Sequence, residues 1–222
     1  MNKKTVLITG VSRGIGKATA VKFLEEGWNV IGTYFNSEEN AKELTKLYPD
    51  IKTYKCDSRD EKSIKLLIES LPKLDLLINN AGIFRGERVS EMNYLDWKEV
   101  IDINLNGMFL MTKYSLPLLR KSEKPVIINI SSRVANDSLL GAGYIAYSVS
   151  KSAVNTFSKA LNIEEEKIKV ASFNPEITDT DIFRKTFTKD EQEEVIESNS
   201  LRTTSETANE IYDLYKSMLL RI

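Results

Sequence analysis

Short runs of β-branched apolar residues alternate along the chain with longer segments that repeat apolar residues at helical spacing. The runs predict six strands, over Val6–Thr9, Val30–Tyr34, Ile51–Cys56, Leu74–Ile78, Val126–Ile130 and Ile168–Phe173. The longer segments predict helices over Ile15–Glu26, Glu38–Tyr48, Asp60–Ser70, Tyr94–Leu119, Tyr147–Asn162 and Ser205–Leu220. This alternation indicates βαβ units with right-handed crossovers.

We therefore expect an α/β fold, a Rossmann-like doubly wound parallel sheet of six strands with helices on both faces. Ligands of such sheets bind beyond the carboxyl ends of the strands. A length of 222 residues fits one domain, predicted over 1–222. Only residues 179–204 depart from the pattern, being polar and charged with isolated Phe183 and Phe187. This segment is interpreted either as a substrate lid or as a helical surface excursion.

Composition excludes several classes of function. Lys and Arg total 31 against 32 Asp and Glu, so no strong net field attracts nucleic acid or a membrane. No apolar stretch approaches the roughly 18 residues of a membrane span. The lone Cys56 fits a soluble protein of the reducing cytoplasm. Without any His, and with one Cys, a His- or Cys-built metal site is not expected, and acid–base chemistry falls to Tyr, Lys, Asp or Glu.

Three glycines, Gly10, Gly14 and Gly16, lie between the first predicted strand and the helix that follows it. Glycine there lets the backbone approach a pyrophosphate and exposes the N–H groups of the helix N-terminus to it. A glycine triplet alone is weak evidence. The strand before it and the helix after it supply the context that a dinucleotide site requires.

Tyr147 and Lys151 lie four residues apart in a predicted helix, so both side chains share one face. A tyrosine ordinarily titrates near pH ~10, and a nearby ammonium would favour its phenolate. We therefore expect a lowered pKa for Tyr147. Tyr144 is a competitor, but Ser148 follows it at the same spacing and offers no ammonium. Tyr144 is interpreted as a wall of the substrate pocket or as simple packing.

The spacing from Thr9 to Gly16, T-G-x-x-x-G-x-G, resembles the short-chain dehydrogenase/reductase family of the classical type. The resemblance extends over roughly residues 4–182 and recurs in Asn79-Asn80-Ala81-Gly82, Asn104, Ser131-Ser132 and Tyr147-Ser-Val-Ser-Lys151. Within this family, the chain is similar to 3-oxoacyl-carrier-protein reductases and related carbonyl reductases. It implies an NADP(H)-dependent oxidoreductase that reduces a small or acyl-chain ketone to an alcohol, or runs the reverse, by hydride transfer.

The resemblance also implies a catalytic set of Asn104, Ser132, Tyr147 and Lys151. Tyr147 would donate a proton to the carbonyl oxygen, while Lys151 lowers the pKa of Tyr147 and holds the nicotinamide ribose. Ser132 would hydrogen-bond the same oxygen, with Ser131 as the alternative, and Asn104 would hold a water behind Lys151. Cofactor contacts are expected from Gly10, Ser12, Arg13, Gly14, Ile15, Gly16, Thr33, Asp57, Asn80, Ala81, Gly82, Tyr147, Lys151, Pro175, Ile177 and Thr180.

The end of the second strand, Thr33–Asn36, carries no acid that would bind the adenosine ribose and repel the 2′-phosphate of NADP. Arg13 in the glycine loop is suited to pair with that phosphate or to stack on adenine, unless it is only a solvated charge. NADP(H) is therefore the preferred cofactor, with NAD(H) left open. Asp57 resembles the family residue that binds the adenine amino group, and its alternative role is a helix cap.

The chain departs from the family pattern in two loops. The segment Arg133–Ala146 is longer than usual and carries Leu139 and Leu140, which are expected to shape the pocket. After Pro175, Glu176 stands where the family usually has glycine. It either disturbs the cofactor geometry or adds a charge near the substrate.

The chain ends at Ile222 without the seventh strand and Gly-Gly ending usual in the family. Tetramers that pair their seventh strands would lose that contact. We therefore expect a homodimer through the helices Tyr94–Leu119 and Tyr147–Asn162, with a tetramer left open. Glu176 and the short ending also support a second class of function, a catalytically inactive NADP(H)-binding sensor or regulatory protein.

Overall fold

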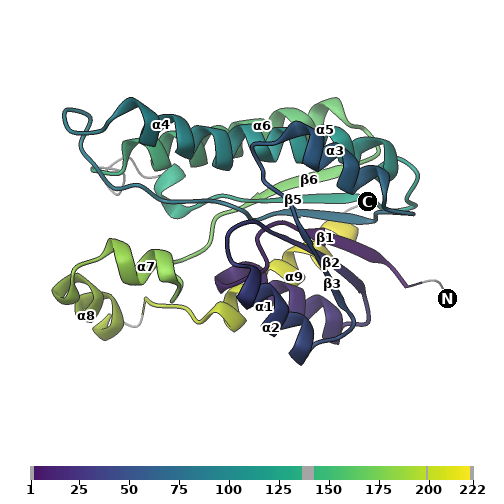
Figure 1. The fold of residues 1–222 in the computed structure, drawn as a ribbon, viewed down its shortest axis with the longest axis horizontal. Coiled ribbons are helices and arrows are strands. Elements are labelled where there is room, and N and C mark those ends of the chain that lie inside the picture. Colours follow the sequence, from purple (N-terminus) through teal and green to yellow (C-terminus); the bar gives the residue numbers. More distant parts are fainter. Residues whose placement is uncertain (1–2, 137–142, 199, 221–222) are drawn as a thin grey trace.

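The computed structural model describes residues 3–136, 143–198 and 200–220. Its centre is a sheet of parallel strands in the order β3-β2-β1-β4-β5-β6 (Figure 1). The strands are β1 Thr5–Ile8, β2 Asn29–Tyr34, β3 Ile51–Lys55, β4 Leu76–Asn79, β5 Val126–Ile130 and β6 Lys169–Phe173. Each strand lies within two residues of a predicted one. The predicted six-stranded, doubly wound sheet is therefore confirmed, and its strand order reverses between β1 and β4.

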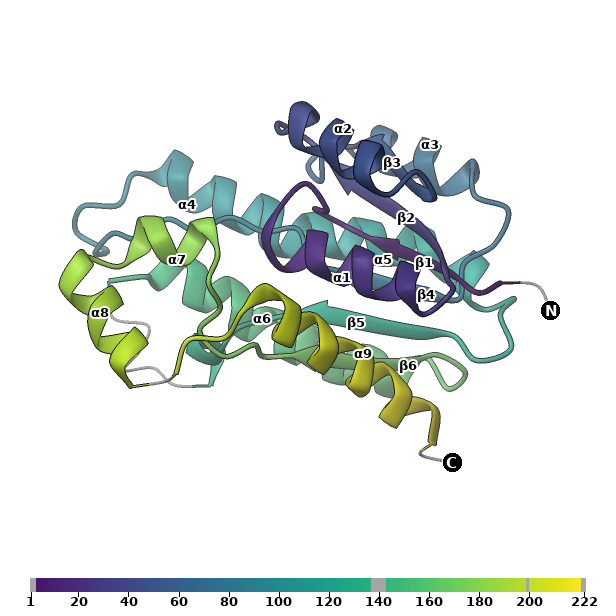
Figure 2. The ribbon, with the colours of Figure 1, turned by 90° about the horizontal axis from the view of Figure 1, so that it is seen from below.

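Helices cover both faces of the sheet and line its carboxyl edge (Figures 1 and 2). They are α1 Gly14–Glu25, α2 Glu38–Leu47, α3 Glu61–Glu69, α4 Tyr94–Ile101, α5 Gly107–Leu119, α6 Ile145–Glu164, α7 Asp181–Thr186, α8 Lys189–Glu197 and α9 Thr204–Leu220. In the part of the chain that the structure describes, none of them is long and apolar enough to cross a membrane.

Alternation along the strands divides the core into two layers. In β1, Val6 and Ile8 point toward α1, α2 and α9, while Leu7 points toward α3, α5 and α6. The central strands β4 and β5 alternate in the same way, because successive side chains of a strand face opposite sides of the sheet. Both faces are apolar, which explains the nearly continuous apolar runs of these strands in the sequence.

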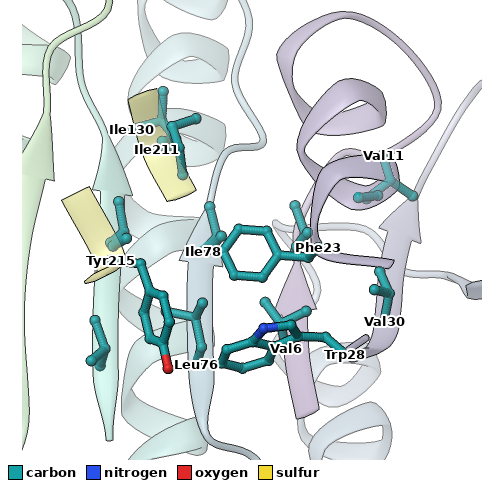
Figure 3. Packing of buried hydrophobic residues seen from close by; sticks show 14 of the residues in the cluster. Val6, Val11, Phe23, Trp28, Val30, Leu76, Ile78, Ile130, Ile211 and Tyr215 are labelled. Carbon is teal, nitrogen blue, oxygen red and sulfur yellow. The ribbon is translucent and has the colours of Figure 1, made fainter. Parts of the chain in front are cut away.

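An aromatic cluster joins the last helix to the first half of the fold (Figure 3). Trp28 packs edge-on against Phe23 of α1 and Tyr215 of α9, with ring centroids 5.2 and 5.0 Å apart. Burial raises the pKa of Tyr215 to about 12, and its hydroxyl accepts a hydrogen bond from Lys4 Nζ at 2.9 Å. These contacts hold helix α1, which begins at the glycine loop, against α9.

The predicted continuous helix Tyr94–Leu119 was wrong in one respect. A π-helical turn, Asp102–Asn106, separates α4 from α5 and contains Asn104. Helix α6 also begins at Ile145, two residues before the predicted start. Wide turns of the π type are frequent at functional sites, because they redirect side chains that a regular helix would place elsewhere.

Residues 179–204, the α7–α8 excursion, fold into two short helices that lie beyond the carboxyl edge of the sheet (Figure 2). Its two ends meet at a parallel bridge between Thr178 and Arg202. There the Arg202 N–H donates to the Ile177 carbonyl at 2.7 Å, and the Asp179 N–H donates to the Arg202 carbonyl at 2.8 Å. The excursion thus has a fixed base, and its role as a substrate lid stays a prediction.

Candidate active site

The glycine loop connects β1 to α1 at the point where the strand order reverses. Gly10 and Gly14 have φ angles of +75° and +56°, in the left-handed region that favours glycine. At Gly16 the reason is space, because a Cβ there would overlap the Gly10 carbonyl oxygen and the Asn80 side-chain nitrogen. The loop can therefore bring its backbone close to a ligand only with glycine at these three positions.

Hydrogen bonds tie the glycine loop to the turn after β4. The hydroxyl of Thr9 accepts hydrogen bonds from the N–H groups of Asn80 and Ala81, both at 2.9 Å. In return, Asn80 Nδ2 donates to the carbonyls of Thr9 and Gly10, at 2.8 and 3.1 Å. Two motifs that lie some seventy residues apart in the sequence are thus joined.

One cleft is lined by all but one of the predicted cofactor-binding residues. They are Gly10, Ser12, Arg13, Gly14, Ile15, Gly16, Thr33, Asp57, Asn80, Ala81, Gly82, Tyr147, Lys151, Pro175 and Thr180. Ile177 does not line this cleft, since it lies at the base of the α7–α8 excursion. The cradle of glycines and the elongated lining fit a dinucleotide, and the individual contacts stay predictions.

Asp57 lines this cleft and lies two residues after the end of β3. Its carboxylate accepts a hydrogen bond from the Arg59 N–H at 2.9 Å, and it also accepts from the guanidinium at 2.8–3.2 Å. The Arg59 guanidinium holds the pKa of Asp57 below its usual value. The alternative role of Asp57 as the cap of α3 belongs instead to Asp60, whose side chain accepts from the Lys62 N–H.

Arg13 points from the glycine loop toward the α7–α8 excursion. Its Nε lies 3.5 Å from a carboxylate oxygen of Asp181, the first residue of α7. Both side chains are 57% exposed, so this ion pair contributes about 0–1 kcal/mol and is readily exchanged for another anion. Thr180 caps the same helix by accepting from the Phe183 N–H.

Tyr147 and Lys151 line the cleft, and Ser132 contacts Tyr147. The Ser132 and Tyr147 hydroxyls are hydrogen-bonded to each other. Lys151 Nζ lies 5.6 Å from the centre of the Tyr147 ring and donates to the Ile130 carbonyl at 2.8 Å. The alternative serine, Ser131, is fully buried and donates instead to the Lys151 carbonyl at 2.9 Å. The geometry therefore favours Ser132 over Ser131.

The electrostatics of this pair differ from the prediction. Burial raises the pKa of Tyr147, and the hydrogen bond from Ser132 opposes the rise only in part. Burial also lowers the pKa of Lys151 to about 8, because its side chain is only 5% exposed. The expected lowering of the Tyr147 pKa by Lys151 is thus not seen in this structure, where desolvation favours the neutral form of each group.

Asn104 is buried in the π-helical turn, which packs beside α6. Its side chain accepts from the Ile83 N–H at 2.8 Å, and it donates to the Ile83 carbonyl at 2.9 Å and to Ser150 Oγ at 3.1 Å. Ser150 Oγ donates in turn to the Tyr147 carbonyl at 2.7 Å. Asn104 therefore fixes the segment after Gly82 against α6, and the water expected between it and Lys151 stays a prediction.

Glu176, which stands where the family usually has glycine, contacts the other loop that departs from the family pattern. The Glu176 carboxylate pairs with the guanidinium of Arg133 at 2.6 Å, and both side chains are nearly half exposed. The pair joins the loop after Ser132 to the loop that carries Pro175. The negative charge that Glu176 adds is thus paired with the positive charge of Arg133. Leu139 and Leu140, also predicted to shape the pocket, lie outside the described residues.

A second cleft adjoins the first between the segment after β4 and α7. Its aromatic wall contains Phe84 and Tyr144, whose ring centroids are 5.1 Å apart. Phe84 also packs edge-on against Tyr147 at 5.2 Å. The structure therefore places Tyr144 at a pocket wall. Phe183 and Phe187 stack on each other at 5.1 Å inside the excursion and do not line this cleft.

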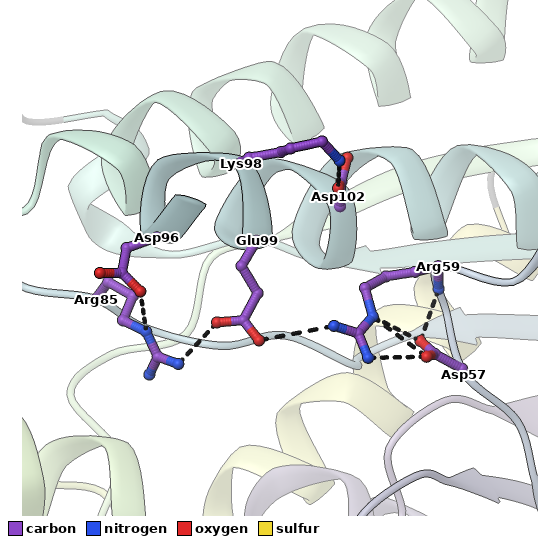
Figure 4. Close-up of polar contacts among 7 residues, drawn as sticks. All are labelled: Asp57, Arg59, Arg85, Asp96, Lys98, Glu99 and Asp102. Carbon is purple, nitrogen blue, oxygen red and sulfur yellow. Dashed lines mark hydrogen bonds and ion pairs between the residues drawn. The ribbon is translucent and has the colours of Figure 1, made fainter. Parts of the chain in front are cut away.

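A chain of charged side chains along the cleft was missed by sequence reasoning (Figure 4). Glu99 of α4 lies 2.7 Å from the Arg85 guanidinium and 3.8 Å from that of Arg59. Arg59 also covers the ring of Phe35, with its guanidinium 5.3 Å from the ring centre. Arg59 lies four residues after β3 and Arg85 six residues after β4, and this position beyond a strand end is the signal that pointed to them in the sequence.

Comparisons with known proteins agree with this geometry. A family model described as short chain dehydrogenase matches residues 4–191. An NADP-dependent 3-hydroxy acid dehydrogenase of Schizosaccharomyces pombe is 35% identical over 224 residues, which cover 95% of this chain and 86% of the relative. A 3-oxoacyl-[acyl-carrier-protein] reductase of Staphylococcus aureus is 36% identical over 142 residues, 59% of this chain and 56% of the relative.

The fold is shared as well. The solved structure of ElxO with NADP bound superposes with a TM-score of 0.84 at 31% identity, covering 96% of this chain and 91% of that one. The resemblance predicted from the motifs is confirmed. The chain belongs to the short-chain dehydrogenase family and is an oxidoreductase that acts on CH–OH or C=O groups.

Proposed function

We propose that this protein reduces a ketone or aldehyde to an alcohol, or runs the reverse, with NADP(H) as its cofactor and Tyr147 as its proton donor. The hydrogen-bonded pair of Ser132 and Tyr147 beside Lys151, at the dinucleotide cleft, is the observation that carries the proposal. NADPH, when bound, supplies a hydride to the carbonyl carbon and leaves as NADP⁺.

The residues of this chain then have separate tasks. The Tyr147 phenol, kept protonated by its burial, donates its proton to the carbonyl oxygen. The Ser132 hydroxyl hydrogen-bonds the same oxygen and orients it toward Tyr147. Lys151, with a pKa of about 8, titrates near neutral pH and restores the proton of Tyr147.

The cofactor choice rests on charge at the adenosine end. The tip of β2, Thr33–Asn36, offers no carboxylate to repel a 2′-phosphate, and Arg13 lines the same cleft. The cofactor of the ElxO complex is NADP, and the fission yeast relative is named as NADP-dependent. NADP(H) is therefore the expected cofactor, while NAD(H) remains a weaker alternative.

We also propose an assembly and a location for this protein. The expected homodimer would pair α4, α5 and α6 with their copies, and Phe109 of α5 and Ile163 of α6 are exposed apolar side chains on these helices. A cytoplasmic location stays the expectation, in keeping with the free, buried thiol of Cys56.

Replacing Tyr147 by Phe tests the proton donor. We expect turnover with NADPH to fall by about 10²–10⁴, since general acid catalysis contributes that much. NADPH affinity should change less than twofold, as followed by its fluorescence. Tyr144→Phe is the matched control, because Tyr144 precedes α6 and lines the second cleft with a ring that Phe keeps, so the variant should keep most of the turnover. Unchanged activity of Tyr147→Phe would overturn the assignment. Cofactor binding without turnover of any carbonyl by the wild type would favour a sensor instead.

A further inference from the structure

The proposed function leaves open which alcohols and ketones the protein takes, and the charges around the second cleft narrow the choice. We propose that Lys185 and Thr186 on α7 bind a carboxylate of the substrate, so that the enzyme acts on hydroxy acids and their oxo acids. This inference rests on the proposed function, because it names the substrate class of the same site.

The second cleft is where such a substrate would extend. It shares Gly82, Ile83 and Ile182 with the dinucleotide cleft, so the two are continuous. Its Phe84 wall contacts Tyr147. A substrate with its reacting oxygen at Tyr147 therefore directs the rest of its chain along this wall and toward α7, whose Lys185 and Thr186 line the opposite side.

The other cations near the two clefts already have partners, which for Lys151 is the Ile130 carbonyl and for Arg59 are Asp57 and Glu99. Three further arginines pair as Arg13 with Asp181, Arg85 with Glu99, and Arg133 with Glu176. Within residues 3–136, 143–198 and 200–220, Lys185 has no ion-pair or hydrogen-bond partner. In this structure the carboxylate of Asp181, which is the acidic residue among the described lining of this cleft, pairs with Arg13 and not with Lys185. The cleft thus presents an ammonium without a counter-ion.

Thr186 supplies an independent observation. Its hydroxyl is shielded from solvent and makes no hydrogen bond to any described residue. A buried hydroxyl that lacks a partner is uncommon, because its desolvation is not repaid. Thr186 lines the same cleft as Lys185 and follows it directly in the last turn of α7. An ammonium and a hydroxyl at adjacent positions offer two donors to one carboxylate, and a charged acceptor strengthens both hydrogen bonds.

Comparing each hydroxy acid with its methyl ester separates the effect of the carboxylate charge from the effect of the substrate's shape. The oxidation rates of 2-hydroxybutyrate, 3-hydroxybutyrate and 4-hydroxypentanoate with NADP⁺ are compared with those of their methyl esters. We expect the wild type to prefer at least one acid over its ester. Lys185→Met should lower kcat/KM for that acid about tenfold through KM, and Thr186→Val about threefold, with the ester changed less than twofold. Lys189→Met, which removes a lysine of α8 that does not line the cleft, is the control and should alter neither.

A binding measurement distinguishes failure of this inference from failure of the proposed function. Calorimetry follows the binding of the same acids to the NADP⁺ complexes of Tyr147→Phe and of Tyr147→Phe combined with Lys185→Met. Tighter binding of an acid than of its ester, lost with Lys185, supports the carboxylate site even if the wild type turns over nothing, in which case only the proposed function fails. Equal affinity for acids and esters, or a Lys185→Met effect equal on both, overturns the inference.

Discussion

The glycine loop and the α7–α8 excursion border the same cleft, but different forces hold them. The loop is fixed by hydrogen bonds from Asn80 and by close backbone contacts at Gly16. The excursion is fixed at its base by the bridge between Thr178 and Arg202, and it meets the glycine loop through the exposed ion pair between Arg13 and Asp181. Close packing leaves a single backbone path, whereas exposed ion pairs of about 0–1 kcal/mol break and re-form easily. The cofactor side of the site is thus built in advance, and the substrate side is free to adjust.

The largest effect on cofactor binding is expected from a substitution in the closely packed glycine loop. Gly16→Ala adds a methyl group that overlaps the Gly10 carbonyl, so the loop must shift. We expect NADPH affinity to fall at least a hundredfold, or ~2.7 kcal/mol, together with a loss of about 1–3 kcal/mol of stability. Fluorescence titration and urea unfolding measure the two quantities.

Gly27→Ala is the matched control for that substitution. Gly27 has a positive φ, +81°, unlike Gly16, and a Cβ there meets nothing within 4 Å. Its variant should lose stability of about 1 kcal/mol from backbone strain and keep its NADPH affinity. If Gly16→Ala and Gly27→Ala bound NADPH equally well, the glycine loop could shift to accept the added methyl group without losing its cofactor site.

The sequence was most informative about the glycine loop and the sheet. Glycine spacing and the β-branched runs predicted the strands within two residues, because buried parallel strands need apolar side chains on both faces. The π-helical turn at Asn104 could not be predicted, since its local sequence is as helical as that of its neighbours. The pairs Arg85–Glu99 and Arg133–Glu176 join different elements, so no local pattern carries them.

A second test addresses the buried lysine at the centre of the site. Lys151 has a pKa of about 8 when folded, against an ordinary value of 10.5. Between these values the unfolded chain binds more protons than the folded one, so this group makes stability rise with pH. From pH 8 to 9.5 the gain is about 1.5 kcal/mol.

Urea unfolding without cofactor at several pH values measures this slope. Lys151→Met should flatten it by the stated amount, and Lys113→Met, which removes an exposed lysine of α5, controls for the loss of a lysine as such. The window ends below pH 10 because the raised pKa of Tyr147 acts in the opposite direction above it. An identical slope in Lys151→Met and the wild type would mean that Lys151 is solvated, and its role in the proton path would need revision.

The smallest effect is expected at the exposed pair of Arg13 and Asp181. Arg13→Ala should weaken NADPH binding about tenfold, or ~1.4 kcal/mol, and change NADH binding less than twofold, because only NADPH carries the 2′-phosphate. Equal losses for the two cofactors would show that Arg13 stacks on adenine or holds the loop.

Asp181→Asn is the opposite arm of the same experiment. It removes the carboxylate that competes for Arg13 while keeping the size of the side chain, so NADPH should bind two- to threefold more tightly. Raising the salt concentration should weaken the wild-type pair as well, since exposed charges are screened, and the advantage of Asp181→Asn should then shrink. Weaker NADPH binding by Asp181→Asn would instead mean that the ion pair positions α7 for the cofactor, and the excursion would belong to the pre-built part of the site.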